Sequence, residues 1–165
     1  ILVQIKTGLG IDSHRFSKEV TEGRPFMLGG VQWDEPLSLS GNSDADVVLH
    51  ALTDAISSIT GNTIIGQKAD ELCRQGIIDS SEYLKLALAD LNSFQITHVA
   101  IALECLRPKI DPKVQKMRAS IAQLLSIGAD CIGITATSGE RLTDFGRGEG
   151  IFCKVIVTVV KDSND

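Results

Sequence analysis

Aromatic residues are scarce in this chain of 165 residues, where Phe, Trp and Tyr together make up only 4%. The core must therefore be mostly aliphatic. Basic residues are also in the minority, with 16 Lys and Arg against 21 Asp and Glu and a net charge of −5. This balance argues against a nucleic-acid partner, because neutralising many phosphates requires a basic face. It leaves room for a small phosphorylated substrate, which a few local cations or a metal ion can hold.

Long hydrophobic runs and paired cysteines are missing as well. No run approaches the ~18 apolar residues of a membrane span, and the N-terminus has no signal-peptide pattern, so no membrane partner is expected. The cysteines contain no C-x-x-C pair, which argues against a zinc knuckle and a disulfide framework. Most lie in apolar runs, where buried free thiols and a reducing compartment are expected. The four are Cys73, Cys105, Cys131 and Cys153.

The remaining pattern alternates between strands and helices. Strands are predicted at "LVQIKTGLGID", "ITHVAIALECL", "DCIGITATS" and "GIFCKVIVTVV", and "PFMLGGVQW" predicts a strand broken by a glycine bulge or tight turn. Helical spacing predicts helices at 43–60, 80–91 and 111–127, with a loop and a short helix in between at 61–79. Ser43 is the expected N-cap of the first helix and Gly61 its expected end. With no repeat or linker, one α+β domain over 1–165 is expected.

Two stretches carry potential metal ligands. In "GLGIDSHRF", Asp12 and His14 share one face if the segment is extended. In "SDADVVLHALTD", Asp46, His50 and Asp54 line one side of a helix. His50 opposite the first pair gives two imidazoles and one carboxylate, a ligand set that suits zinc. The alternatives stay open: Asp46 as a helix cap only, and Asp54 as a solvated residue rather than a partner that orients a histidine.

A third stretch, "ATSGERLTDFGRGEG" at 136–150, suits phosphate chemistry. Thr137 and Ser138 stand at the end of a predicted strand and are followed by Glu140, Arg147 and Glu149 among glycines. Hydroxyls, backbone amides and a guanidinium suit phosphate oxygens, and a carboxylate suits Mg²⁺. A plain glycine-rich turn is the alternative for "GRGEG" taken alone.

In this order the three stretches resemble the 2-C-methyl-D-erythritol 2,4-cyclodiphosphate synthase family. "LGGV" and "RPKI…MR" add to the resemblance, which covers essentially the whole chain apart from a poor stretch at 62–76. The combination of D-x-H, S-D-x-D-V-x-x-H and G-R-G-E-G is far more specific than any one of its parts. The resemblance implies an α+β subunit with a mostly four-stranded sheet covered by helices. It also implies a homotrimer around a central axis, with active sites between the subunits.

The resemblance further implies an enzyme of non-mevalonate isoprenoid biosynthesis, a phosphorus–oxygen lyase. The 2-phosphate of 4-diphosphocytidyl-2-C-methyl-D-erythritol 2-phosphate attacks the β-phosphorus, releasing CMP and closing a cyclic diphosphate. A location in the cytoplasm is expected for a bacterial source, and in a plastid-type stroma for a eukaryotic one whose leader has been removed.

The resemblance also assigns roles to residues. Asp12, His14 and His50 would bind one Zn²⁺ per subunit, and Glu140 a second ion, Mg²⁺ or Mn²⁺. Catalytic roles fall on Asn42 and Ser138. The axial cavity, in which the family has been proposed to hold an isoprenoid diphosphate, would be lined by Arg147 and Glu149. The positions that match substrate-binding ones are Ser43, Ile64, Ile65, Gly66, Pro108, Lys109, Ile110, Thr137 and Arg147.

Two positions depart from the family pattern. Asn42 stands where the family usually has His, so it can donate a hydrogen bond but cannot carry a positive charge. Ile64 stands where the family has an Asp that binds the erythritol hydroxyls, and Asn62 or Asp70 are candidates to compensate. These departures motivate an alternative function, a non-catalytic trimeric binder of cytidine nucleotide or isoprenoid diphosphate. A metal-dependent phosphohydrolase is a third hypothesis.

Overall fold

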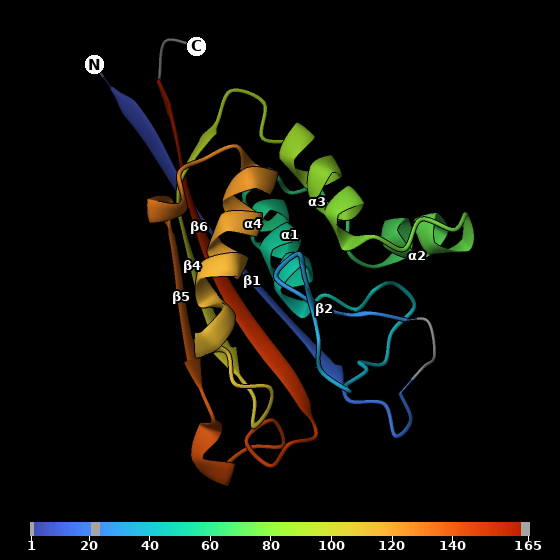
Figure 1. The fold of residues 1–165 in the computed structure, drawn as a ribbon. Coiled ribbons are helices and arrows are strands. Elements are labelled where there is room, and N and C mark those ends of the chain that lie inside the picture. The colour runs from blue at the N-terminus through green and yellow to red at the C-terminus, as the bar shows by residue number, and fades with distance from the viewer. Residues whose placement is uncertain (1, 21–23, 163–165) are drawn as a thin grey trace.

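One mixed sheet of four strands forms the framework of the computed structural model, which describes residues 2–20 and 24–162 (Figure 1). The strand order is β1-β6-β4-β5; β6 is antiparallel to both of its neighbours, and β5 is parallel to β4. The predicted α+β class and four-stranded sheet are confirmed. The strands are β1 (Val3–Arg15), β4 (Gln95–Glu104), β5 (Ile132–Thr137) and β6 (Gly150–Asp162).

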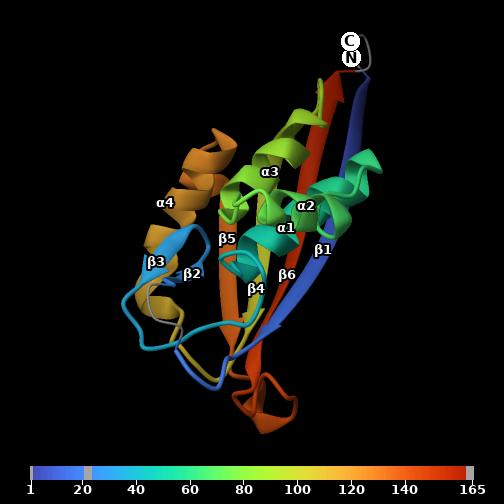
Figure 2. The same ribbon diagram turned by 90° about the vertical axis from the view of Figure 1, so that its right-hand side faces the viewer.

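The helices lie on one side of this sheet, as Figures 1 and 2 show, and the opposite face carries no helix among the described residues. The short helix predicted within 61–79 is present as α2. Apart from Tyr83, the largest fully buried side chains are aliphatic or Met, as the shortage of aromatics predicts. No helix of the described ranges has the length and apolar character needed to cross a bilayer. The helices are α1 (Val47–Thr60), α2 (Gln67–Arg74), α3 (Ser80–Ala89) and α4 (Val114–Leu125).

Two glycines on β1 allow α1 to lie directly against the sheet. Gly8 and Gly10 are buried on the face of β1 that meets α1. A methyl group added to either would overlap a helix backbone carbonyl, that of Ala55 at Gly8 and that of Ala51 at Gly10. Because side chains alternate along a strand, the same face continues to the D-x-H pair. The glycines therefore bring the helix backbone within reach of those two ligands.

The start of α1 differs from the prediction that Ser43 caps it. Asp46 is the N-cap, and its carboxylate accepts hydrogen bonds from the first-turn amides of α1 and from the amides of Gly29 and Gly30. These glycines form the tight turn of a small hairpin. The chain before the cap turns sharply at Ala45, which has φ of 55°. The hairpin strands are β2 (Phe26–Leu28) and β3 (Val31–Trp33).

The other helix ends are partly as predicted. Gly61 ends α1 in a left-handed conformation, with φ of 78°. The third predicted helix begins with a 3₁₀ turn at Asp111–Lys113, and α4 follows it. That helix ends at Ser126, whose φ is 55°, and not at Gly128. A polar serine thus takes the left-handed position usually given to glycine.

The cysteines are free thiols, and two of them are buried in the core. Burial raises the pKa of Cys105 to about 11 and that of Cys153 well above its usual value. The prediction of buried free thiols is confirmed for Cys105 and Cys153. Cys73 and Cys131 are free thiols as well, but they are only half-buried.

Candidate metal centre and phosphate turn

Three predicted metal ligands meet where β1 faces α1. Asp12 and His14 come from β1, and His50 comes from the first turns of α1. Asp12 Oδ2 lies 3.0 Å from His14 Nε2 and 3.3 Å from His50 Nδ1, and the two ring nitrogens are 3.3 Å apart. One ligand atom from each residue lies within 4.8 Å of the others. The structure thus contains the metal-binding triad that the spacing predicts.

The environment of Asp12 fits a bound cation. Its Oδ2 atom is buried and has no hydrogen-bond donor among the described residues. Burial acts to raise the pKa of this carboxyl, but the imidazoles of His14 and His50 beside it outweigh the effect of burial, and the pKa is lowered. A buried carboxylate oxygen beside two imidazole nitrogens is a donor set that divalent zinc accepts. The residues present therefore fit a divalent metal ion.

Both histidines are held by partners on the side away from the triad. His14 Nδ1 lies 2.7 Å from the carbonyl oxygen of Ser40. Since a carbonyl only accepts, Nδ1 is the donor and Nε2 faces the other ligands. His50 Nε2 lies 2.8 Å from Ser80 Oγ and 3.2 Å from Ser43 Oγ. Ser80 Oγ in turn donates to the carboxylate of Asp44.

Asp44 and Ser80 are the site residues that the sequence interpretation missed. Asp44 lies inside the "SDAD" string, where no spacing rule separates it from Asp46. Ser80 is separated from His50 by 30 positions, and no local pattern links them. Only the packing of α3 beside α1 brings them together.

Of the two aspartates predicted to orient a histidine, Asp46 does not. Its carboxylate is occupied by backbone amides of the helix start and the hairpin. Asp54 is half-buried, and burial together with the charge of Asp12 raises its pKa to about 6, although His50 lowers it. Within the described ranges, no hydrogen bond joins Asp54 to His14 or His50. Its interaction with Asp12 and His50 is electrostatic.

A cavity of about 310 Å³, called the metal cavity below, opens beside the triad. Several predicted substrate-binding residues line it, and so does Asp70 from α2. Ile64 does not, because its side chain is fully buried in the core. Asn62 donates to Asp90 and is not part of the lining. The lining residues are Asp12, His14, Gly41, Asn42, Ser43, His50, Ile65, Gly66, Ala69, Asp70, Cys73 and Tyr83.

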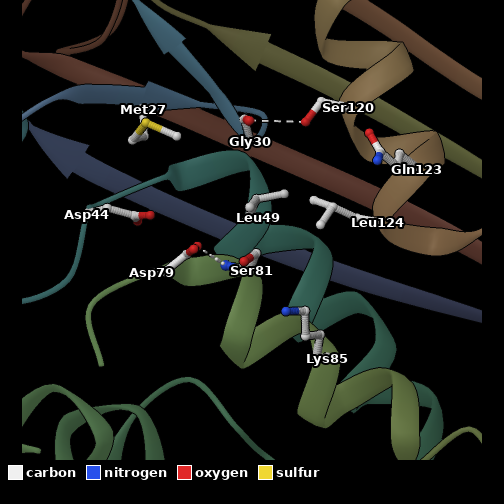
Figure 3. A pocket seen from close by; sticks show the side chains of 10 residues that line it. All are labelled: Met27, Gly30, Asp44, Leu49, Asp79, Ser81, Lys85, Ser120, Gln123 and Leu124. Atoms are coloured by element: carbon white, nitrogen blue, oxygen red, sulfur yellow. Dashed lines mark hydrogen bonds between the residues drawn. The ribbon is translucent and has the colours of Figure 1, made fainter. Parts of the chain in front are cut away.

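Figure 3 shows a second cavity, of about 440 Å³. Asp44 and Leu49 contribute to it from one side, and Lys85 of α3 and Gln123 of α4 from the others. It shares no lining residue with the metal cavity. Asp44 of this cavity is next in sequence to Ser43 of the first cavity.

The predicted phosphate-binding residues lie on the opposite edge of the sheet. Thr137 and Ser138 follow β5, whereas the D-x-H pair is on β1, and two strands separate these edges. Glu140 is outside the metal cluster of the same subunit. Gly139, Glu140 and Arg141 all have positive φ, of 70°, 51° and 61°. Two consecutive non-glycine residues in this region make a strained turn, a feature that often marks functional sites.

The remaining predicted residues extend from the same end of the sheet. Arg147 donates to Asp144 at 2.6 Å, and Glu149 pairs with Arg15 of β1. Lys109 is exposed. Pro108 and Ile110, on either side of it, are buried. None of these residues is among the lining residues of the metal cavity.

Comparisons with known proteins agree with this geometry. The family model named YgbB family matches residues 5–160. A 2-C-methyl-D-erythritol 2,4-cyclodiphosphate synthase of Chlamydia caviae is 48% identical, covering 96% of this chain and 91% of the relative. The corresponding enzyme of Chlamydia trachomatis serovar L2b is 44% identical, covering 94% and 88%.

Solved structures show the same fold. The bifunctional IspDF of Campylobacter jejuni superposes with a TM-score of 0.87 at 32% identity, covering 98% of this chain and 43% of that one. A 2C-methyl-D-erythritol-2,4-cyclodiphosphate synthase described as a bound form with CDP gives 0.80 at 28%, covering 93% and 99%. Since the family model spans nearly the whole chain and the metal triad is in place, this chain belongs to the YgbB family.

Proposed function

We propose that the chain converts 4-diphosphocytidyl-2-C-methyl-D-erythritol 2-phosphate to 2-C-methyl-D-erythritol 2,4-cyclodiphosphate and CMP. The observation that carries this proposal is the Asp12–His14–His50 triad beside a cavity, in a chain whose curated relatives bear the name of that activity. The two curated relatives named above are bacterial, which favours the bacterial alternative for its location. The direct test is CMP release from this substrate, lost on chelation and restored by adding metal back.

We propose Zn²⁺ at the triad and Mg²⁺ or Mn²⁺ at Glu140. Bound metal would polarise phosphate oxygens and neutralise the charge that keeps two phosphates apart. The chain's own part is to hold both groups in line. Asn42, which lines the metal cavity, would donate a hydrogen bond to a phosphate oxygen. Ser138 and Thr137 would contact the diphosphate from the strained turn after β5.

The separation of these two groups supports the proposed homotrimer. The triad lies at the β1 edge and Glu140 lies beyond the β5 edge, so a single subunit has two incomplete half-sites. A head-to-tail contact would place the β5 edge of one subunit against the β1 edge of the next. Such contacts close into a ring when the rotation permits. The ring would also cover two sheet edges that would otherwise stay open.

The uncovered face of the sheet supports the same assembly. Ile5, Leu9 and Ile11 of β1 point away from α1 and are 64%, 54% and 54% exposed. Ile156 of β6 is also exposed. Three such faces turned toward a common axis would bury this apolar surface. Arg147 would line the axial cavity, where an isoprenoid diphosphate is the proposed ligand, and Glu149 would lie beside it.

Mixed trimers test the shared site. His50→Ala and Glu140→Ala subunits should each be inactive alone. Refolded together, they should regain activity, because some interfaces then combine His50 of one subunit with Glu140 of its neighbour. The measurement is CMP release as a function of mixing ratio, with the oligomer size checked by light scattering. If each site lies within one subunit, the mixture stays inactive.

Asp70 is proposed to bind the erythritol hydroxyls in place of the carboxylate that Ile64 cannot provide. It lines the metal cavity from α2, whereas Ile64 is buried. A hydrogen bond to a charged group contributes about 1.5–3 kcal/mol, so Asp70→Ala should raise KM about 10- to 100-fold. Glu71→Ala is the matched control, because Glu71 is an exposed neighbour outside the cavity. Equal KM values for the two variants would contradict this role.

A further inference from the structure

We infer that Asp44 and Ser80 are positioning residues that fix the tautomer of His50. They hold its ring proton on Nε2, so that Nδ1 offers a lone pair to the metal triad. This inference rests on the proposed metal site. It concerns two residues that contribute no atom to the triad itself.

The donors and acceptors around Ser80 fix the direction of each hydrogen bond. Its hydroxyl has one proton, and that proton goes to Asp44 Oδ1, because a carboxylate only accepts. The oxygen of Ser80 is then left as an acceptor for its other neighbour. That neighbour is His50 Nε2, at 2.8 Å. His50 Nε2 must therefore carry the proton.

Other donors hold the Asp44 carboxylate in place. Its Oδ2 accepts from the Ser80 amide at 3.0 Å, and its Oδ1 accepts from the Asp46 amide at 3.1 Å. The Asp44 amide donates to the Ile78 carbonyl at 2.9 Å. These bonds tie the loop before α1 to the start of α3. The orientation of the carboxylate is thus set by the backbone and does not depend on His50.

Burial makes the arrangement persistent. Ser80 is fully buried and His50 is 7% exposed, so water competes little for their hydrogen bond. Ser43 Oγ, 3.2 Å from His50 Nε2, already accepts from the Ala45 amide at 3.1 Å. The Ser43 hydroxyl can donate or accept, and Ser80 Oγ, at 2.8 Å, is the nearer partner of His50 Nε2. The ring proton of His50 therefore lies on Nε2, and Nδ1 carries none.

The tautomer of His50 decides which of its nitrogen atoms can bind a metal ion at the triad. With Nε2 protonated, His50 Nδ1 presents a lone pair toward Asp12 Oδ2, 3.3 Å away, and toward His14 Nε2, also 3.3 Å away. The Ser40 carbonyl imposes the complementary choice on His14. Three electron-pair donors then converge on one point, which a cation can satisfy. Hydrogen bonds to the outer nitrogen of a ligating histidine commonly set its orientation and affinity.

Nitrogen-15 NMR of the metal-free protein reads the tautomer directly. In the wild type, His50 should show a protonated Nε2 and an unprotonated Nδ1. Asp44→Ala should shift the population toward protonated Nδ1, because the Ser80 proton becomes free to bond Nε2. A wild-type His50 with the proton on Nδ1 would overturn the inference, and so would an unchanged tautomer ratio in Asp44→Ala.

Zinc affinity, measured by competition with a chelator, supplies the second readout. Ser80→Ala should weaken binding about 10- to 100-fold, the usual cost of losing an outer partner of a metal ligand. Ser80→Thr, which keeps the hydroxyl, should retain most of the affinity. Ser81→Ala is the matched control on the same turn of α3, since Ser81 faces the second cavity (Figure 3).

The outcomes separate the inference from the function on which it rests. If the wild type binds zinc and Ser80→Ala binds it within twofold, the positioning role is wrong. If the wild type binds no zinc, the proposed metal site is wrong, and the nitrogen shifts still decide the tautomer. A loss of folding in Ser80→Ala is detected by circular dichroism, and the Asp44→Ala spectrum then decides.

Discussion

Replacing His50 by alanine should lower kcat/KM for CMP release by more than about 100-fold, beyond the usual loss for an outer partner of a metal ligand. His50 is the only member of the triad that comes from α1. Without it, Asp12 and His14 alone would have to hold the ion. The measurement is steady-state CMP release with added zinc, together with zinc content after dialysis.

The matched control is His98→Ala. His98 is an exposed histidine on β4, outside the metal cavity. Its replacement should leave zinc content and turnover unchanged. Wild-type turnover in the His50→Ala variant, with its fold intact, would show that the metal triad is not needed for the reaction.

Gly10→Ala should lower the free energy of unfolding by about 3 kcal/mol, the upper part of the usual range for overpacking a core. The added methyl group meets the Ala51 carbonyl and the backbone of Ala55, neither of which can rotate away. Relief requires α1 to move off β1. Because His50 moves with α1, zinc affinity should fall together with stability.

Urea unfolding and chelator competition on the same preparation measure both effects. Gly133→Ala on β5 is the matched control, since a methyl group there meets nothing within 4 Å and its backbone needs no special conformation. Equal unfolding free energies for the two variants would contradict the close-approach role of Gly10. A stability loss without any change in zinc affinity would show that Gly10 stabilises the fold but does not position the metal triad.

The metal triad was predictable from the sequence because its geometry is local on each element. Asp12 and His14 are two apart on a strand, and His50 projects from a strongly patterned helix. The helix that carries it has a clear C-terminal glycine at Gly61, whose role the structure confirms.

The surroundings of the triad were less predictable because they depend on contacts between distant segments. Asp46 looked like a helix residue that could orient a ligand, but Gly29 and Gly30 of the hairpin occupy its carboxylate. Ser80 gave no local signal for its bond to His50. Such pairings depend on tertiary packing, which spacing within one element does not encode.

The separation of Glu140 from the triad has the same origin. The sequence order of the strands does not give their order in the sheet, so the distance between the β1 and β5 edges was not foreseen. Ile64 illustrates a different limit. Alignment with a family motif placed it in a substrate site, whereas its apolar side chain is buried in the core.

The proposed reaction is an intramolecular attack that consumes no water. Running the reaction in water labelled with oxygen-18 tests this point. The purified protein, with Zn²⁺ and Mg²⁺, is given the diphosphocytidyl substrate, and the products are analysed by mass spectrometry. The account predicts CMP and the cyclic diphosphate, both without the heavy isotope. Products carrying one oxygen-18, or binding of the substrate without any turnover, would contradict it.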